Sequence, residues 1–186
     1  MRIAVFCGSS LGDRPIYTEG AKALGKYLAE QKIDLVYGGG KVGLMGVVAD
    51  AVLDAGGDVY GVIPVSLSTK ELAHPGLTEL QVVADMHERK AAMAEMSDAF
   101  IAMPGGAGTL EEIFEAWTWA QLGYHQKACA FYNLDGFFDP LLAMIDKMSA
   151  SGFVKPMHAQ MLIRETSPEA LIESIHRYQP PVHKWA

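Results

Sequence analysis

The chain has 186 residues, of which 50% are hydrophobic and 20% charged, so it is long and apolar enough to bury a sizeable core in one globular domain. Its formal net charge of -7 argues against a general surface for nucleic-acid polymers or anionic membranes, because those partners favour clustered lysine and arginine. Two cysteines, Cys7 and Cys129, are too few for a disulfide framework or a four-ligand zinc site. Both are expected to be reduced core thiols, and any phosphate site must be local.

Strand-like and helix-like patterns alternate along the chain. Short apolar runs predict strands at residues 2–6, 33–37, 59–63, 80–83, 99–103 and 127–132. Amphipathic periodicity predicts helices at residues 15–31, 43–55, 85–97, 109–122, 137–150 and 168–177. This alternation is typical of a parallel sheet with helices on both faces. We assign residues 1–178 to this domain and residues 179–186, which contain two prolines, to a loose or surface-docked C-terminal tail.

The N-terminal sequence and the hydropathy pattern indicate in which cellular compartment the protein is expected. The chain enters its first apolar run directly, without a charged leader followed by a long apolar segment. No run approaches 18 uninterrupted apolar residues. We therefore expect a cytoplasmic protein with no membrane partner.

Two of three glycine-rich segments that follow predicted strands have ambiguous roles. Residues 7–10 (Cys-Gly-Ser-Ser) offer hydroxyls and a flexible turn near the place where open parallel sheets bind ligands, but a plain turn explains them equally well. Residues 38–46 formally contain G-x-G-x-x-G. Pro64 and Val65 stand where a ribose-binding acid should follow the next strand, which argues against NAD, and Val42 after Lys41 excludes a Walker A loop. A mononucleotide-binding turn and tight helix packing both remain open.

The third segment, residues 104–112 (Pro-Gly-Gly-Ala-Gly-Thr-Leu-Glu-Glu), is the most informative one. Its glycines let backbone N–H groups approach an anion closely, and a helix beginning near Thr109 adds unpaired donors and the positive end of its dipole. The alternative is that Thr109 merely caps the helix and Glu112 completes a capping box. A capping box, however, requires neither the Pro-Gly-Gly turn nor Glu111. The pattern therefore favours a phosphate site.

The helix predicted at residues 85–97 carries an unusual cation. Asp85 and Glu88 have the spacing of a helix cap, which needs no function. Arg89 shares the spacing of three and four residues with Met86, Met93 and Met96, so it should face inward. A buried guanidinium requires a carboxylate, a phosphate or a similar acceptor, and a structural salt bridge to a glutamate is the alternative to a ligand. His74, His87 and His125 are scattered without metal-ligand spacing and are interpreted as surface or loop residues.

Residues 104–112 fit the P-G-G-x-G-T-x-x-E signature of the Lonely Guy (LOG) family, the phosphoribohydrolases that activate cytokinin nucleotides. Residues 86–90 (Met-His-Glu-Arg-Lys) resemble the arginine-lysine motif of that family, and residues 97–100 and 118–123 resemble its flanking segments. The resemblance extends over nearly the whole chain.

The resemblance implies a single-domain, Rossmann-like, doubly wound α/β homodimer without metal or other cofactor. Such an enzyme cleaves the N-glycosidic bond of a nucleoside 5'-monophosphate, AMP or N6-prenyl-AMP, to the free base and ribose 5-phosphate. Arg89 and Glu112 match the family's catalytic pair. With the first glycine loop added, the expected substrate-binding residues are Gly8, Ser9, Glu71, Lys90, Gly105, Gly106, Ala107, Gly108, Thr109, Glu111 and Thr118.

Three questions stay open at this level. The segment around Glu71 departs from the plant form of the family, because His74-Pro75-Gly76 replaces a more threonine-rich stretch, so the preferred base is not specified. A non-catalytic nucleotide-binding protein or a cofactor carrier of the same fold is the alternative function. Older descriptions of similar sequences as lysine decarboxylases find no support in a recognisable pyridoxal phosphate lysine.

Overall fold

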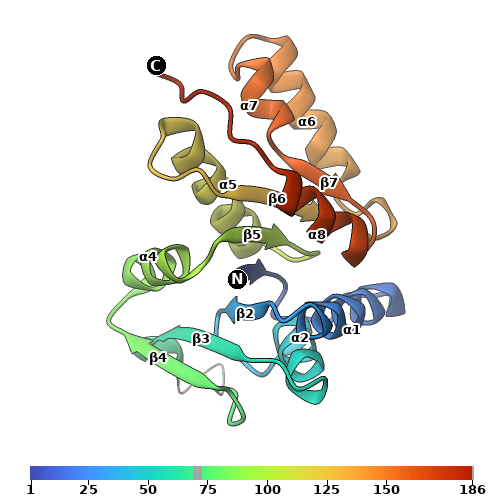
Figure 1. Ribbon diagram of the computed structural model, residues 1–186, viewed down its shortest axis with the longest axis vertical. Coiled ribbons are helices and arrows are strands. Elements are labelled where there is room, and N and C mark those ends of the chain that lie inside the picture. Colours follow the sequence, from blue (N-terminus) through green and yellow to red (C-terminus); the bar gives the residue numbers. More distant parts are fainter. Residues whose placement is uncertain (69–72, 186) are drawn as a thin grey trace.

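The computed structural model describes residues 1–68 and 73–185, which form one parallel sheet of seven strands with helices on both faces (Figure 1). The strands are β1 (Arg2–Phe6), β2 (Asp34–Tyr37), β3 (Val59–Pro64), β4 (Glu79–Val83), β5 (Ala99–Ala102), β6 (Ala128–Tyr132) and β7 (Ile163–Glu165). The helices are α1 (Pro15–Glu30), α2 (Gly43–Asp54), α3 (Val65–Ser68), α4 (Met86–Met96), α5 (Ala107–Leu122), η1 (Leu134–Gly136), α6 (Asp139–Ala150), α7 (Pro156–Gln160) and α8 (Pro168–Arg177). None of these described helices combines the length and the hydropathy needed to cross a membrane.

The predicted α/β architecture is confirmed, and the predicted strands and long helices agree with the observed ones to within two residues at each end. Four short elements were not predicted, namely α3, η1, α7 and the edge strand β7. Each has three to five residues, too few to establish a periodicity. The helix expected to begin near Thr109 begins at Ala107.

Alternation along the central strands separates the core into two layers. Ile3 and Val5 pack on the side of α1, α2 and α8, whereas Ala4 and Phe6 pack on the side of α4, α5, α6 and α7. All four side chains are at most 6% exposed, as expected for a strand buried on both faces. The sheet is therefore a rigid platform between two helical layers.

The strand order β4-β3-β2-β1-β5-β6-β7 reverses its direction of growth between β1 and β5. Ligands of open parallel sheets bind beyond the carboxyl ends of the strands at such a switch point. The first and third glycine segments meet here, because the Gly8 N–H donates to the Pro104 carbonyl at 3.1 Å. The topology thus brings two segments about 100 residues apart in sequence to one place.

The C-terminal tail is docked rather than loose. The Lys184 N–H donates to the Gln121 carbonyl at the end of α5, at 2.8 Å. The imidazole of the buried His158 in α7 lies 3.1 Å from the Val182 carbonyl. The surface-docked alternative is therefore the correct one for the described residues of the tail.

Candidate active site

A cleft of about 360 Å³ lies at the switch point and collects residues from five parts of the chain. The loop after β1, the first turns of α4 and α5, the start of α2 and the short α3 all contribute to its wall. The lining residues are Cys7, Gly8, Ser9, Met45, Leu67, Met86, Arg89, Gly106, Ala107, Gly108, Thr109, Glu111 and Glu112. The cleft therefore brings Arg89 and Glu112, 23 positions apart in sequence, to one cavity beside the glycine loop.

The N-terminus of α5 is open toward this cleft. Gly106 is its N-cap residue, and no side chain caps the helix. A Cβ placed on Gly106 or Gly108 would meet no atom within 4 Å, so space lies in front of the first turn. The capping-box alternative is wrong, because Thr109 is the third residue of the helix. The uncapped donors and the helix dipole suit an anion at this point.

Gly105 and Thr109 form a tight contact beneath the loop. Thr109 is 4% exposed, and its Oγ1 lies 2.1 Å from the point that a Cβ on Gly105 would occupy. The Gly8 N atom lies 2.8 Å from the same point. Only a residue without a side chain therefore fits between β1 and α5. Gly105 itself lines the adjoining cavity on the α1 side, together with Gly8, Ser9 and Gly106.

The Gly105→Ala substitution is expected to destabilise the fold by about 1–3 kcal/mol, the usual cost of forcing a methyl group into a packed site. Chemical denaturation followed by circular dichroism measures this cost. Gly106→Ala is the matched control for stability, because its methyl group would project into open space. Equal stability of the two variants would contradict the packing role of Gly105.

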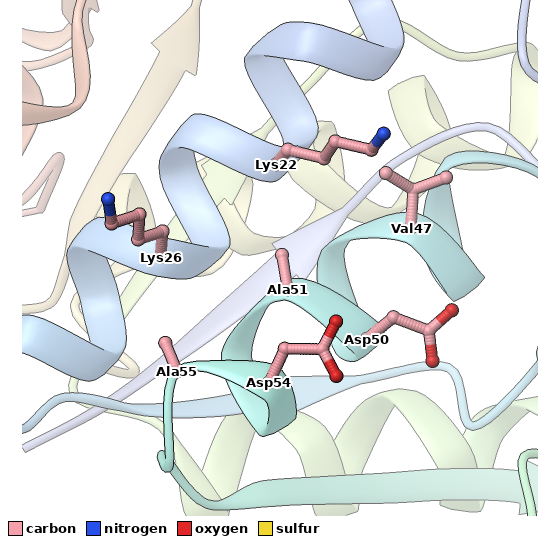
Figure 2. Close-up of a pocket in the computed structure, with 7 residues that line it drawn as sticks. All are labelled: Lys22, Lys26, Val47, Asp50, Ala51, Asp54 and Ala55. Atoms are coloured by element: carbon pink, nitrogen blue, oxygen red, sulfur yellow. The ribbon is translucent and has the colours of Figure 1, made fainter.

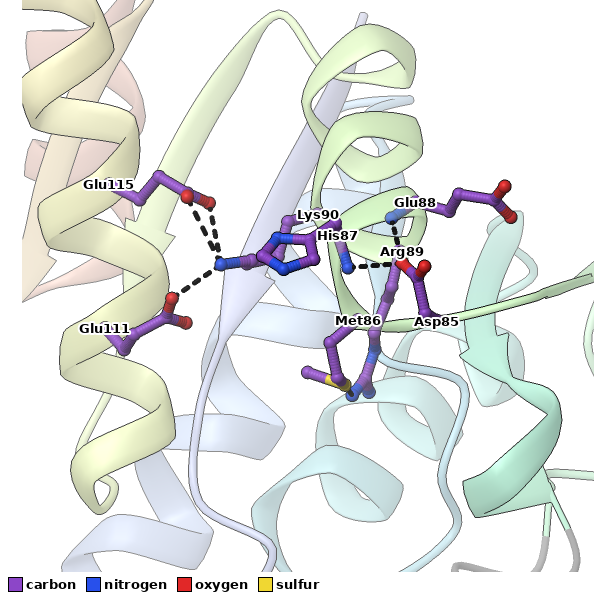
Figure 3. A network of polar contacts seen from close by, with 8 residues as sticks. All are labelled: Asp85, Met86, His87, Glu88, Arg89, Lys90, Glu111 and Glu115. Atoms are coloured by element: carbon purple, nitrogen blue, oxygen red, sulfur yellow. Dashed lines mark hydrogen bonds and ion pairs between the residues drawn. The ribbon is translucent and has the colours of Figure 1, made fainter.

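Arg89 faces inward, as its spacing predicts. It is 5% exposed, and its guanidinium donates to two main-chain carbonyls, from Nε to Val62 at 3.0 Å and from Nη2 to Gly38 at 2.7 Å. Its Nη1 lies 3.7 Å from the Met86 sulfur, one turn earlier on α4. Figure 3 shows this guanidinium folded back beside Met86. These carbonyls hold the cation against the ends of β2 and β3 while it lines the cleft.

The start of α4 is well defined, which fixes the origin of the Arg89 side chain. The Asp85 carboxylate accepts from the N–H groups of Glu88 at 2.9 Å and His87 at 2.8 Å, and these donors lower the pKa of that carboxyl. In return, the Glu88 carboxylate accepts from the Ala84 N–H at 2.8 Å. The predicted cap is confirmed.

Lys90 points away from Arg89 toward the side of α5 (Figure 3). Its Nζ donates to Glu111 at 2.5 Å and to Glu115 at 3.2 Å, and hydrogen bonds to Glu111 and then Glu115 raise the pKa of the ammonium. Thr118 follows on α5 and is exposed. Lys90 and Thr118 thus lie outside the lining of the cleft. Glu111 lines the cleft and also pairs with Lys90. Glu71 lies outside the described residues.

The second glycine segment serves packing. The N–H groups of Leu44 and Met45, at the start of α2, both donate to the Gly8 carbonyl, at 3.0 and 3.4 Å. Gly43 has φ +60, and a Cβ there would lie 2.2 Å from the backbone of Ser9. These donors are used within the protein, so tight helix packing is the better of the two interpretations of this segment.

Four lining residues were not predicted as site residues: Cys7, Met45, Leu67 and Met86. Burial, with a smaller contribution from the Glu112 carboxylate, raises the pKa of the Cys7 thiol, so the group is a neutral thiol facing the site. The sequence could have identified Met86, because it shares the helical spacing of Arg89 on α4. No sequence pattern marked Met45 or Leu67 as a site residue, since only the fold brings α2 and α3 to the cleft.

A larger cavity, about 580 Å³, lies between α1 and α2 (Figure 2). Lys22 and Lys26 come from α1, Asp50 and Asp54 come from α2, and small side chains lie between them. It is an open groove without a glycine loop or an open helix N-terminus, so we place the candidate site in the smaller cleft. Within residues 1–68 and 73–185, no three His, Cys, Asp or Glu side chains are grouped to hold a metal ion.

The fold and the cleft define a Rossmann-like α/β protein with an anion-adapted glycine loop beside an arginine and a glutamate. A family model described as "Possible lysine decarboxylase" matches residues 45–175. The cytokinin riboside 5'-monophosphate phosphoribohydrolase LOG7 of Arabidopsis thaliana is 50% identical over 179 residues, which cover 96% of this chain and 82% of that protein. The phosphoribohydrolase LOG1 of the same plant is 46% identical over 185 residues, covering 100% and 87% of the two chains. This chain belongs to the LOG family.

Solved structures support the fold independently. The molybdenum cofactor binding protein of Rippkaea orientalis matches with a TM-score of 0.72 and 24% identity, covering 95% of each chain. At this identity the likeness concerns the architecture alone. The Rossmann-like assignment is confirmed.

Proposed function

We propose that this protein hydrolyses the N-glycosidic bond of a nucleoside 5'-monophosphate, with AMP or an N6-prenyl-AMP as substrate, to release the free base and ribose 5-phosphate. The observation that carries the proposal is the shared cleft, in which Arg89 and Glu112 lie beside the uncapped N-terminus of α5. Family membership supports it, because relatives that match nearly the whole chain are phosphoribohydrolases of this kind.

The 5'-phosphate is expected to bind at the first turn of α5. Gly106, Ala107, Gly108 and Thr109 line the cleft, and the helix dipole adds favourable potential for an anion. Gly8 and Ser9 line the same cleft and would contact the same nucleotide. Anchoring the phosphate converts binding energy into orientation of the sugar.

Glu112 lies one turn into α5 from Gly108 and would face the anomeric carbon of a ribose anchored in this way. As the bond from C1' to the base breaks, the electron pair leaves with the base and positive charge develops on the ribose. A carboxylate stabilises this oxocarbenium-like state and accepts a proton from the attacking water as the hydroxyl bonds to C1', and the departing base takes up one proton, so that one water is consumed for each bond cleaved. Arg89 positions the nucleotide and Glu112. Glu111 and Thr118 contribute from the adjoining face of α5, and Lys90 contributes from α4, where it pairs with Glu111.

Incubation with AMP and with isopentenyladenosine monophosphate, followed by chromatography, tests the activity. We expect release of adenine or of the prenylated base together with ribose 5-phosphate. Comparable rates on the two substrates would favour nucleotide salvage over hormone activation. A non-catalytic carrier would bind nucleotide and release no base, and mass spectrometry of the denatured protein would reveal a carried cofactor.

The older description as a lysine decarboxylase implies pyridoxal phosphate, which needs a lysine of lowered pKa for its Schiff base. The described lining of the cleft contains no lysine. Lys90, which lies next to it, is held by Glu111 and Glu115, and its pKa is raised instead. The described residues of the cleft therefore do not fit this cofactor, and the reaction proposed here needs none.

We also propose a cytoplasmic homodimer. Both cysteines are free and buried, which agrees with a reducing compartment. Ile113 and Trp117 of α5 are buried in the core, whereas Thr118 on the same helix is exposed and Tyr124 just beyond it is 75% exposed. This outer side of α5 is available to a second copy. Light scattering after size-exclusion chromatography measures the mass of the assembly.

A further inference from the structure

Gly38 directly follows β2 and begins the glycine segment that packing, not ligand binding, explains. It is buried, and its φ lies outside the left-handed region. Its backbone conformation is thus open to any residue. In this it differs from its neighbour Gly39, with φ +78. The absence of a side chain at position 38 therefore needs another reason.

That reason is the Arg89 guanidinium. A Cβ on Gly38 would lie 2.0 Å from Nη2 of Arg89 and 3.1 Å from its Cζ. Contacts below 3.0 Å do not persist, so the guanidinium occupies the volume that a side chain at position 38 would take. The Gly38 carbonyl simultaneously accepts from the same Nη2 at 2.7 Å. Gly38 thus leaves the space that the Arg89 guanidinium occupies and also accepts a hydrogen bond from it.

An alanine at position 38 would displace the arginine and leave the backbone in place. The Met45 sulfur lies 3.3 Å from the added methyl group and closes another side. The guanidinium would lose its 2.7 Å contact to residue 38 and its 3.0 Å contact to Val62, and the open direction is the cleft. The tip of a flexible side chain can move without a shift of the backbone, so the cost to the fold is confined to these two hydrogen bonds.

We propose that Gly38 is a positioning residue for the reaction, which acts by fixing the Arg89 guanidinium at the wall of the cleft. The inference deepens the proposed function and rests on the role of Arg89 given there. A misplacement of about 1 Å can cost about 10²-fold in rate. We therefore expect Gly38→Ala to lower kcat/KM for AMP by about 10²-fold, with a Tm no lower than that of Arg89→Ala, which loses the same two carbonyl contacts.

A double-mutant cycle with AMP as the substrate tests the proposal, using Gly38→Ala, Arg89→Ala and the combined variant. If Gly38 acts through Arg89, the combined variant is no slower than Arg89→Ala alone. If the loss of kcat/KM in the combined variant equals the product of the two single losses, the inference is overturned. The control is Ser151→Ala, an exposed residue after α6 that lies outside the lining of the cleft, and it is expected to retain wild-type kinetics.

A crystal structure of Gly38→Ala gives a readout that does not depend on activity. Displacement of the guanidinium from the Val62 carbonyl supports the positioning role, and an unmoved guanidinium overturns it. Normal turnover by Arg89→Ala would refute the proposed role of Arg89 in the reaction, yet the crystal structure would still decide the positioning. Should Gly38→Ala lower the Tm below that of Arg89→Ala, removal of Arg89 in the combined variant must raise it to the Arg89→Ala value; failure to do so contradicts the steric argument.

Discussion

Glu112→Gln is expected to lower base release severely and to leave AMP binding largely intact. The amide keeps the shape of the side chain but removes the negative charge that stabilises the ribose cation and the capacity to accept a proton. Carboxylates in such roles contribute about 10²–10⁴-fold, so kcat is expected to fall by that factor. Steady-state release of adenine measures kcat, and calorimetric titration with AMP measures binding.

The control for Glu112→Gln is Glu19→Gln, which removes the same charge from an exposed position on α1. It is expected to retain wild-type kinetics. Unchanged base release by Glu112→Gln would refute its catalytic role. Loss of AMP affinity together with turnover would instead assign Glu112 to substrate binding.

Arg89→Ala lowers both turnover and nucleotide affinity. It deletes a planar donor next to the substrate, and charged hydrogen bonds contribute about 1.5–3 kcal/mol each, which corresponds to roughly 10–10²-fold in kcat/KM. It also removes the hydrogen-bond donor of the Gly38 and Val62 carbonyls, so a loss of about 1–3 kcal/mol in the free energy of unfolding is expected as well. Kinetics are therefore measured well below the Tm of the variant.

Arg177→Ala provides the comparison, since its side chain is 77% exposed and pairs only with Glu173 along α8 among the contacts described. Its expected effect on kinetics is nil. Normal kcat and KM in Arg89→Ala would leave Arg89 a structural residue. A reduced Tm with normal kinetics would point to the same conclusion.

Much of the site was readable from local sequence because its parts are local. The Pro-Gly-Gly turn and Glu112 lie within nine residues, and the helical stripe through Met86 and Met93 predicted the inward direction of Arg89. The acceptors of Arg89 were not predictable. They are the backbone carbonyls of Gly38, just after β2, and of Val62 in β3, both distant in sequence, where a carboxylate or phosphate was expected.

The cap of α5 shows the limit of motif-based interpretation. Thr109 and Glu112 have capping-box spacing, yet the helix begins at Ala107, and the Thr109 side chain packs under Gly105. A pattern of donors and acceptors along the chain does not reveal which partner is closer in space. The same holds for Lys90, which pairs with Glu111 and Glu115 across two helices.

By itself the sequence determined the α/β class, the phosphate-adapted turn and the inward face of α4, because hydrophobic periodicity and glycine spacing are properties of neighbouring residues. Only the tertiary structure decided the strand order, the hydrogen bond from Gly8 to Pro104 and the position of Met45 and Leu67 at the cleft. Those contacts join segments far apart in the chain. Their geometry follows from how two helical layers pack on one sheet, which no local pattern encodes.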